Sequence, residues 1–136
     1  MWLQLPAAMR ARLLADATVS TAIGERLHYQ ELPQDSALPH VWFRRQGNSS
    51  DQFLDWDEAG LVTDRYVMEI CADRDASELV DAIIDSLRGW KNVQIDDRYL
   101  QFVEVEDADD DYVFLTSGAS EADYLHALQI VCYHAE

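Results

Sequence analysis

LVTDRYVMEICA, residues 61–72, is followed three residues later by DASELVDAIIDSLRGW, residues 75–90, and these two segments decide the fold. The first alternates, with Tyr66, Met68 and Ile70 on one face, which is typical of a β-strand. The second repeats apolar residues at the three- and four-residue spacing of an amphipathic helix. It also begins with Asp-x-x-Glu, which predicts a capping box at Asp75 and Glu78. We therefore expect a strand over 61–72 and a helix over 75–90 that covers a sheet.

The flanking sequence adds short helices before this unit and strands around it. Asp16 is placed to cap a short helical turn that Gly24 closes, after a first helix. In one later strand, Leu100 and Phe102 are expected on one face and Val103 and Val105 on the other. The expected helices cover 6–15 and 75–90, with a short helical turn over 19–23, and the expected strands cover 27–30, 40–46, 61–72, 99–106, 112–115 and 124–134. The sequence predicts an α+β fold: a single domain over 1–136, with a mostly antiparallel sheet of about four or five strands and two helices packed on one face.

The net charge of the chain is −16, and it is unevenly distributed. Residues 1–50 hold five Arg and four acidic residues, whereas residues 51–136 hold five Lys or Arg and twenty-two acidic residues. The hydrophobic content of 49% excludes a disordered acidic tail. So strong an acidity argues against binding to nucleic acid or to an anionic membrane. The uneven distribution is consistent with copies that meet head to tail, and equally with an acidic surface that serves solubility.

The beginning of the chain lacks the basic region and apolar run of a signal peptide, and no stretch reaches the length of a membrane helix. We expect no membrane association. Cys71 and Cys132 fall in strand-like segments, and the simplest interpretation is two buried thiols. A disulfide between them remains an alternative if their strands are neighbours.

The strongest local motif is a run of six carboxylates within residues 104–111. Part of it has the spacing of a calcium loop, but Tyr112 replaces the required glycine and Gly118 replaces the final glutamate. A solvated, repelling hairpin tip is the simpler interpretation. The alternative is a small acidic metal-binding or enzymatic domain that uses Asp107, Asp109 and Asp111.

No other motif indicates catalysis or a cofactor. The histidines are scattered without the spacing of a zinc site, and no nucleophile elbow or phosphate-binding glycine loop occurs. The aromatic and basic stretch at 42–45 could stack on single-stranded nucleic acid, but the acidity of the chain opposes that. We expect no enzyme, no metal and no cofactor.

The order of these features resembles the tail completion, or tail terminator, family of long-tailed bacteriophages and related gene transfer particles. The resemblance rests on the turn Ile23-Gly24-Glu25-Arg26-Leu27, on the Leu38-Pro39 entry into a strand, and on a long strand that leads into a helix. At the second of these motifs, the aromatic residues arrive only at Trp42 and Phe43. The acidic run lies outside the pattern.

The resemblance implies a non-enzymatic virion protein of the tail or neck, assembled in the host cytoplasm. It implies a ring, usually of six copies, that caps the tail tube, ends polymerisation and meets the head connector or stopper. We expect DNA to pass through this ring without specific binding. The expected contacts with a subunit or partner are Trp42, Arg44, Arg45, Phe53 and Trp56, and the expected acidic channel or surface is Glu104, Glu106, Asp107, Asp109, Asp110 and Asp111.

Overall fold

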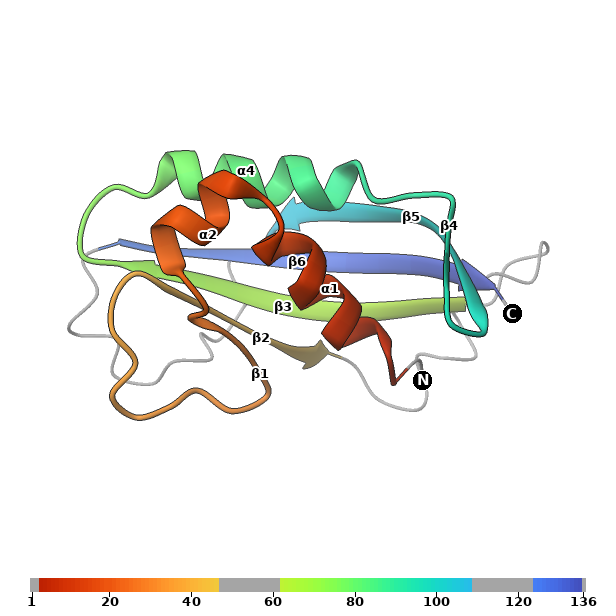
Figure 1. Cartoon of the computed structure of the whole chain (residues 1–136), viewed down its shortest axis with the longest axis horizontal. Helices are drawn as coiled ribbons and strands as arrows, with labels where there is room; N and C mark the ends of the chain where they lie inside the picture. Colours follow the sequence, from red (N-terminus) through yellow and green to blue (C-terminus); the bar gives the residue numbers. More distant parts are fainter. Residues whose placement is uncertain (1–2, 47–61, 109–123, 136) are drawn as a thin grey trace.

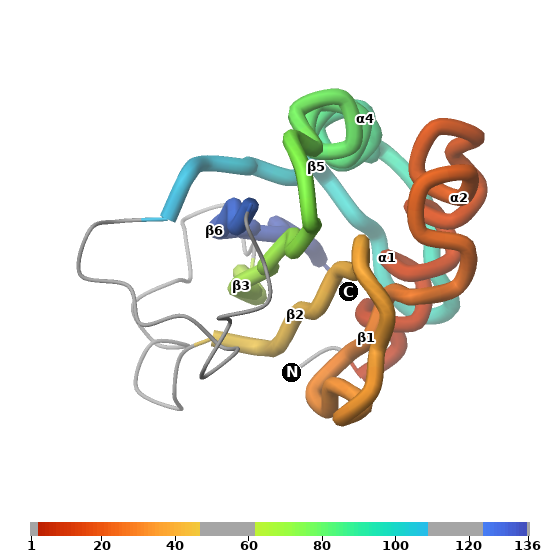
Figure 2. The backbone as a smooth tube through the Cα atoms, turned by 90° about the vertical axis from the view of Figure 1, so that its left-hand side faces the viewer, coloured from red at the N-terminus to blue at the C-terminus, as the bar shows by residue number. Residues whose placement is uncertain are grey.

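The computed structural model describes residues 3–46, 62–108 and 124–135, in which helices cover one face of a curled sheet (Figures 1 and 2). The helices are α1 (Leu5–Leu14), α2 (Ala17–Ile23) and α4 (Ser77–Arg88). The strands are β1 (Leu27–Tyr29), β2 (His40–Gln46), β3 (Val62–Ala72), β4 (Val93–Ile95), β5 (Arg98–Asp107) and β6 (Tyr124–Ala135). The expected strand at 112–115 lies outside the described residues.

The sheet has the strand order β1-β2-β3-β6-β5-β4, with the long strands β3 and β6 at its centre. The β1–β2 pair is parallel, and the other pairs are antiparallel. The α+β class is confirmed, but the expected four or five strands are six among the described residues, and the sheet is mixed. The strand that the sequence did not predict is β4, whose three residues are too few to show an alternation.

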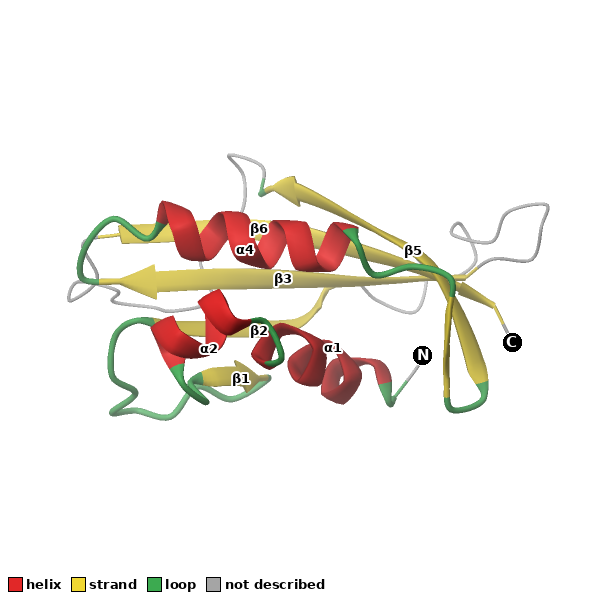
Figure 3. Ribbon diagram, turned by 45° about the horizontal axis from the view of Figure 1, so that its top comes forward, coloured by secondary structure: helices red, strands yellow, loops and turns green. Residues whose placement is uncertain are grey.

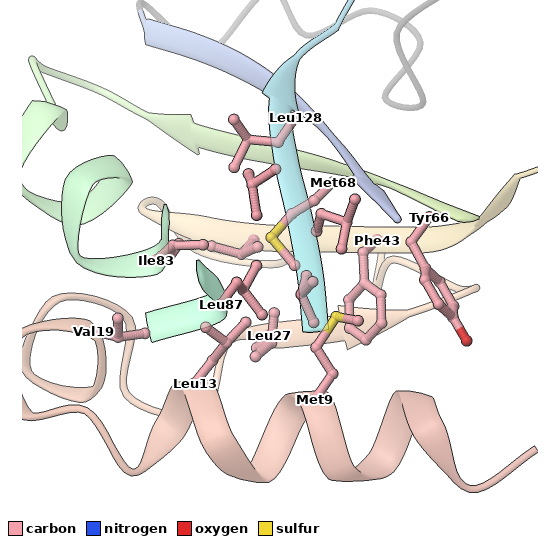
Figure 4. Packing of buried hydrophobic residues seen from close by; sticks show 14 of the residues in the cluster. Met9, Leu13, Val19, Leu27, Phe43, Tyr66, Met68, Ile83, Leu87 and Leu128 are labelled. Carbon is pink, nitrogen blue, oxygen red and sulfur yellow. The ribbon is translucent and has the colours of Figure 1, made fainter. Parts of the chain in front are cut away.

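Among the described residues, three helices, instead of the expected two, pack on the same face of the sheet (Figure 3). The third is the seven-residue α2, which the Asp16 carboxylate caps by accepting hydrogen bonds from the N–H groups of Thr18 and Val19, at 2.9 and 3.2 Å. Side chains from all three helices meet the inner face of the sheet in one apolar core (Figure 4). Its largest fully buried members include Leu5, Met9, Leu13, Ile23, Leu27, Phe43, Tyr66, Met68, Ile70, Ile83 and Leu87.

The beginning of α4 differs from the expected capping box. The N-cap residue is Ala76, which has no side chain for capping, and Asp75 precedes it. The Asp75 carboxylate still accepts a hydrogen bond from the Ser77 N–H at 2.9 Å. Because the helix begins one residue later than expected, Glu78 is the second helical residue and not the third, from which a capping box reaches back.

A bulge in β5 changes which side chains face the core. The pairing of β5 with β6 shifts between Leu100 and Phe102, so that Leu100 pairs with His134 and Phe102 with Tyr133. Leu100 is therefore buried on the helix side, whereas Phe102 is 39% exposed on the other side, stacked on Tyr133. The expectation that Leu100 and Phe102 share a face is wrong, because a bulge inserts a residue that strict alternation cannot foresee.

The turn at residues 23–27 ties α2 to the first two strands. Gly24 ends α2 with a φ of +59°, a backbone conformation that favours glycine. Arg26 then donates from Nε to the Pro39 carbonyl at 2.9 Å, and Arg10 of α1 donates to the Leu27 carbonyl at 3.0 Å. The role of this motif is structural: it fixes the place where β1 joins β2.

Cys71 and Cys132 are free, buried thiols, as the simplest interpretation of the sequence predicted. Their strands are neighbours, but Cys71 pairs with Leu125 whereas Cys132 pairs with Asp64. The thiols are thus seven residues apart along the strands, about 23 Å, and point to opposite faces of the sheet. That separation excludes the alternative disulfide.

Candidate functional site

The side chains of the two neighbouring arginines of β2 point to opposite faces of the sheet. Arg44 is exposed on the face away from the helices, which we call the outer face, and it shares that face with Trp42. The Trp42 indole donates to the Gln30 carbonyl at 3.1 Å. Arg45 points to the helix face and donates to the Asp64 carboxylate. Of this expected pair, Arg44 is exposed, whereas the side chain of Arg45 is 19% exposed.

Arg45 belongs to a buried polar cluster with Asp64, His134 and Arg98, contributed by β2, β3, β6 and β5. His134 Nε2 lies 3.0 Å from Asp64 Oδ2, and His134 Nδ1 lies 3.1 Å from an Arg98 guanidinium nitrogen. A guanidinium can only donate, so Nδ1 accepts and Nε2 carries the proton that His134 donates to Asp64. The cluster links four strands near one end of the sheet.

Charges in this cluster offset the cost of burying it. Burial alone would raise the pKa of the Asp64 carboxyl, but hydrogen bonds from His134 and Arg45 outweigh burial and hold this pKa below its usual value. The pKa values of the neighbouring Tyr66 hydroxyl and Cys132 thiol are raised, mainly by burial. Both groups therefore stay protonated at neutral pH.

We assign a structural role to the polar cluster. Asp64 and His134 are only 1% and 0% exposed, so a substrate has no access to them. Cys132 lies two residues from His134, but a buried thiol with a raised pKa is a poor nucleophile. Sequence reasoning missed this cluster, although His134 continues the buried alternation of Leu128, Ile130 and Cys132.

The acidic residues expected to form one surface divide between the two faces of β5. Glu104 and Glu106 are exposed on the outer face. Asp107 lies on the other side, where its carboxylate is 2.8 Å from His126 Nε2. The remaining expected site residues, Phe53, Trp56, Asp109, Asp110 and Asp111, lie outside the described residues.

Strand register places Arg44 and Glu106 in one row across the outer face. Arg44 pairs with Val67, Val67 with Gln129, and Gln129 with Glu106. By the same pairings, the adjacent row contains Gln46, Arg65, Val131 and Glu104. Three strand spacings separate Arg44 from Glu106, about 14 Å, which is too far for an ion pair within one subunit. Opposite charges thus lie toward opposite margins of the sheet.

A groove of about 630 Å³ separates α2 from the beginning of α4, with Leu38 and Pro39 at its wall. Its charged residues, among them Asp73, Arg74 and Glu78, are exposed. Within the described ranges, no group of three or more His, Cys, Asp or Glu side chains could hold a metal ion. None of the helices in those ranges is long and apolar enough to span a membrane.

These features define a small α+β domain whose polar cluster is structural and whose exposed charges lie near its sheet margins. Residues 7–117 match the family model described as "Tail completion protein gp17". The chain belongs to this tail completion family, and it is a structural protein of a virion tail. The resemblance inferred from the sequence motifs is confirmed.

A comparison with solved structures found the same fold in a chain of a structure titled "Virion of native gene transfer agent (GTA) particle". The two chains are 15% identical with a TM-score of 0.54, and the match covers 96% of this chain and 92% of the other. A search of the curated proteins gave no match.

Proposed function

We propose that this protein forms a ring of six identical subunits that caps the tail tube, ends its polymerisation and joins the tail to the head connector or stopper. Membership of the tail completion family carries this proposal. In this role the protein acts by shape and surface and needs no enzymatic step. It would join the tail in the host cytoplasm and remain at the neck of the particle.

The distribution of charge on the outer face supports closure of a ring. A ring of identical subunits needs two different surfaces on each copy, which meet head to tail around an axis. The two margins of the sheet are complementary in charge: Arg44 lies near one of them, and Glu104 and Glu106 lie near the other. Trp42, Phe53 and Trp56 would add apolar contacts with a subunit or with the tube. Arg45 is assigned instead to the interior of its own subunit, because it is bonded to Asp64.

The acidity of the chain fits a channel through which DNA passes. Six copies would carry a formal charge of −96, six times −16. Carboxylates that line such a channel repel the phosphate backbone, so that the DNA moves without being held. We assign this role to Asp109, Asp110 and Asp111, because Glu104 and Glu106 meet the neighbouring subunit and Asp107 contacts His126 on the other face of the sheet.

Light scattering and electron microscopy of the purified protein with its tail tube protein test the ring. Six-membered rings at the ends of tubes of defined length are expected, and tubes that continue to grow in the presence of the protein would contradict capping. Replacing Asp109, Asp110 and Asp111 by Asn should leave the rings intact and slow the passage of DNA. Unchanged ejection kinetics would remove the channel from the proposal.

A further inference from the structure

Beyond its pairing with β4, strand β5 has an open edge. β4 pairs with β5 only at residues 98–100, and past this point no described strand lies on the far side of β5 (Figure 3). The Ala108 N–H donates to the Ala127 carbonyl, so the even-numbered residues of this stretch direct their backbone groups toward β6. The N–H and C=O groups of Val103 and Val105 therefore point outward, along the edge.

Strand β2 has a similar open edge at the other margin of the sheet. β1 pairs with β2 only at residues 41–43, and β2 continues to Gln46 with no described strand beside it (Figure 1). The Gln30 N–H donates to the Phe43 carbonyl, so odd-numbered residues of β2 direct their backbone groups toward this margin. The N–H and C=O groups of Arg45 therefore point outward, although its side chain is turned to Asp64.

The two open edges occupy the same rows of the sheet. The register of the four inner strands puts Gln46 in the row of Glu104, Arg45 in the row of Val105 and Arg44 in the row of Glu106. β2 and β5 also run in opposite directions, because the three pairings between them are all antiparallel. A second copy placed beside the first, along these rows, brings its β2 antiparallel to β5.

We propose that β5 of one subunit pairs edge to edge with β2 of the next copy, so that one sheet continues from subunit to subunit. This inference rests on the ring of the proposed function and names its contact. Val105 and Arg45 of the neighbouring copy exchange backbone hydrogen bonds in this arrangement. Arg44 then lies directly opposite Glu106, with the helices of both subunits on the same side of the sheet.

A second copy of the chain fits the open edge of β5, because its charges and the faces of its side chains both match those of the first copy. Arg44 and Glu106 are exposed on the outer face of their own sheets, so the continued sheet brings opposite charges together. Pairing of two β5 edges would instead place Glu104 and Glu106 against their own kind. The Arg88 guanidinium donates to the Val105 carbonyl at 3.0 Å. That oxygen has a second lone pair for the neighbouring strand, and the bond guards the edge in the monomer.

Cysteine cross-linking tests the pairing. Residues directly opposite at a non-hydrogen-bonded position have Cα atoms about 4.5 Å apart, which is within reach of a disulfide. Arg44→Cys combined with Glu106→Cys should therefore form covalent oligomers on mild oxidation. Because these positions are about 14 Å apart within one subunit, such a bond can form only between copies. Arg44→Cys with Phe102→Cys is the matched control, shifted by four residues or about 13 Å, and should not cross-link.

Light scattering on the same samples separates the possible outcomes. Oligomers that form without a bond between positions 44 and 106 would overturn the edge pairing and leave the ring in place. Equal cross-linking in the control pair would also overturn it, because the register would be unspecific. A protein that stays monomeric even with its tail tube protein would overturn the ring and the pairing together. As a second variant, the exchange Arg44→Glu with Glu106→Arg should assemble, whereas each single change should not.

Discussion

His134 donates a hydrogen bond from Nε2 to Oδ2 of Asp64 over 3.0 Å, although the two residues are 70 positions apart in the chain. The bond joins the two central strands, and Arg45 and Arg98 extend it to β2 and β5. An ionised carboxylate that is 1% exposed is stable only while these donors surround it. The stability of this end of the sheet therefore depends on all of these polar groups, because each one needs the others as hydrogen-bonding partners.

Asp64→Asn should strongly destabilise the protein. The change leaves the guanidinium of Arg45 without its carboxylate, and breaking a buried pair by removing one partner costs about 3–5 kcal/mol. Urea unfolding would measure this loss. Asp85→Asn, on the exposed side of α4, is the matched control and should change the free energy of unfolding by less than about 0.5 kcal/mol. Equal stabilities of the two variants would refute the structural role of the polar cluster.

Stability should fall as the pH is lowered, in two steps. The pKa of His40 is lowered, chiefly by burial, and its neutral form stabilises the fold above the usual value of 6.5. That contribution is lost as the pH falls from 6.5 through the pKa of the folded state. The lowered pKa of Asp64 makes a second contribution, present above 3.8 and lost at lower pH. In both steps the unfolded chain binds more protons, so stability rises with pH.

Unfolding free energies measured between pH 3 and 8 check both steps. His40→Gln should reduce the step below pH 6.5, to which the lowered pKa of His28 also contributes, and leave the more acidic one. A protein that is more stable at pH 5 than at pH 7 would contradict the sign of this prediction.

Arg44→Glu and Arg45→Glu should have opposite consequences, although the residues are adjacent. Arg44 is exposed, so its reversal should leave the monomer within about 0.5 kcal/mol of the original stability and impair assembly. Arg45→Glu sets a second carboxylate beside Asp64 and should unfold the subunit. Thermal unfolding and light scattering distinguish the two effects, and equal loss of stability would show that Arg44 is not a surface residue.

Gly24→Ala should destabilise the protein by roughly 1–3 kcal/mol, because its φ of +59° strains any residue with a Cβ. Space is not the cause, since the nearest atom to an added Cβ is 3.8 Å away, at the end of the Arg26 side chain. Gly89→Ala is the control for backbone conformation: its φ of −81° is ordinary for alanine, and the closest contact of the added Cβ is 3.3 Å, with the Asp85 carbonyl oxygen. Chemical denaturation of both variants tests this, and a larger loss at Gly89 would contradict it.

Cys71 and Cys132 should resist thiol reagents in the native protein. Both side chains are buried, and burial raises the pKa of the Cys132 thiol, so little thiolate is available to react. Titration with a chromogenic disulfide should detect two thiols only after denaturation. Rapid labelling of both thiols in the native state would contradict their burial.

The sequence predicted those elements whose stability is local. The apolar spacing of α4 and the alternation of β2, β3 and β6 gave their positions closely, because each long element repeats its own pattern. The partner of Arg45 could not be predicted in this way. Asp64 is 19 residues away, and only the register of β2 on β3 turns the two side chains toward each other. The parallel pairing of β1 with β2 could not be predicted either, because the segment that joins the two strands has no periodic pattern.

The bulge at Gln101 shifts by one residue the alternation of β5 side chains between the two faces of the sheet. Leu100 faces the helices, and if Gln101 were part of a strictly alternating strand, Glu104 and Glu106 would lie beneath α4 and Val103 and Val105 would face solvent. The bulge takes Gln101 out of the alternation, and the strand is therefore acidic outside and apolar inside. Deleting Gln101 would remove the bulge and leave residues 102–107 on their present faces, because Leu100 and Phe102 would then alternate directly, so a relative that lacks this residue needs no change in its hydrophobic pattern.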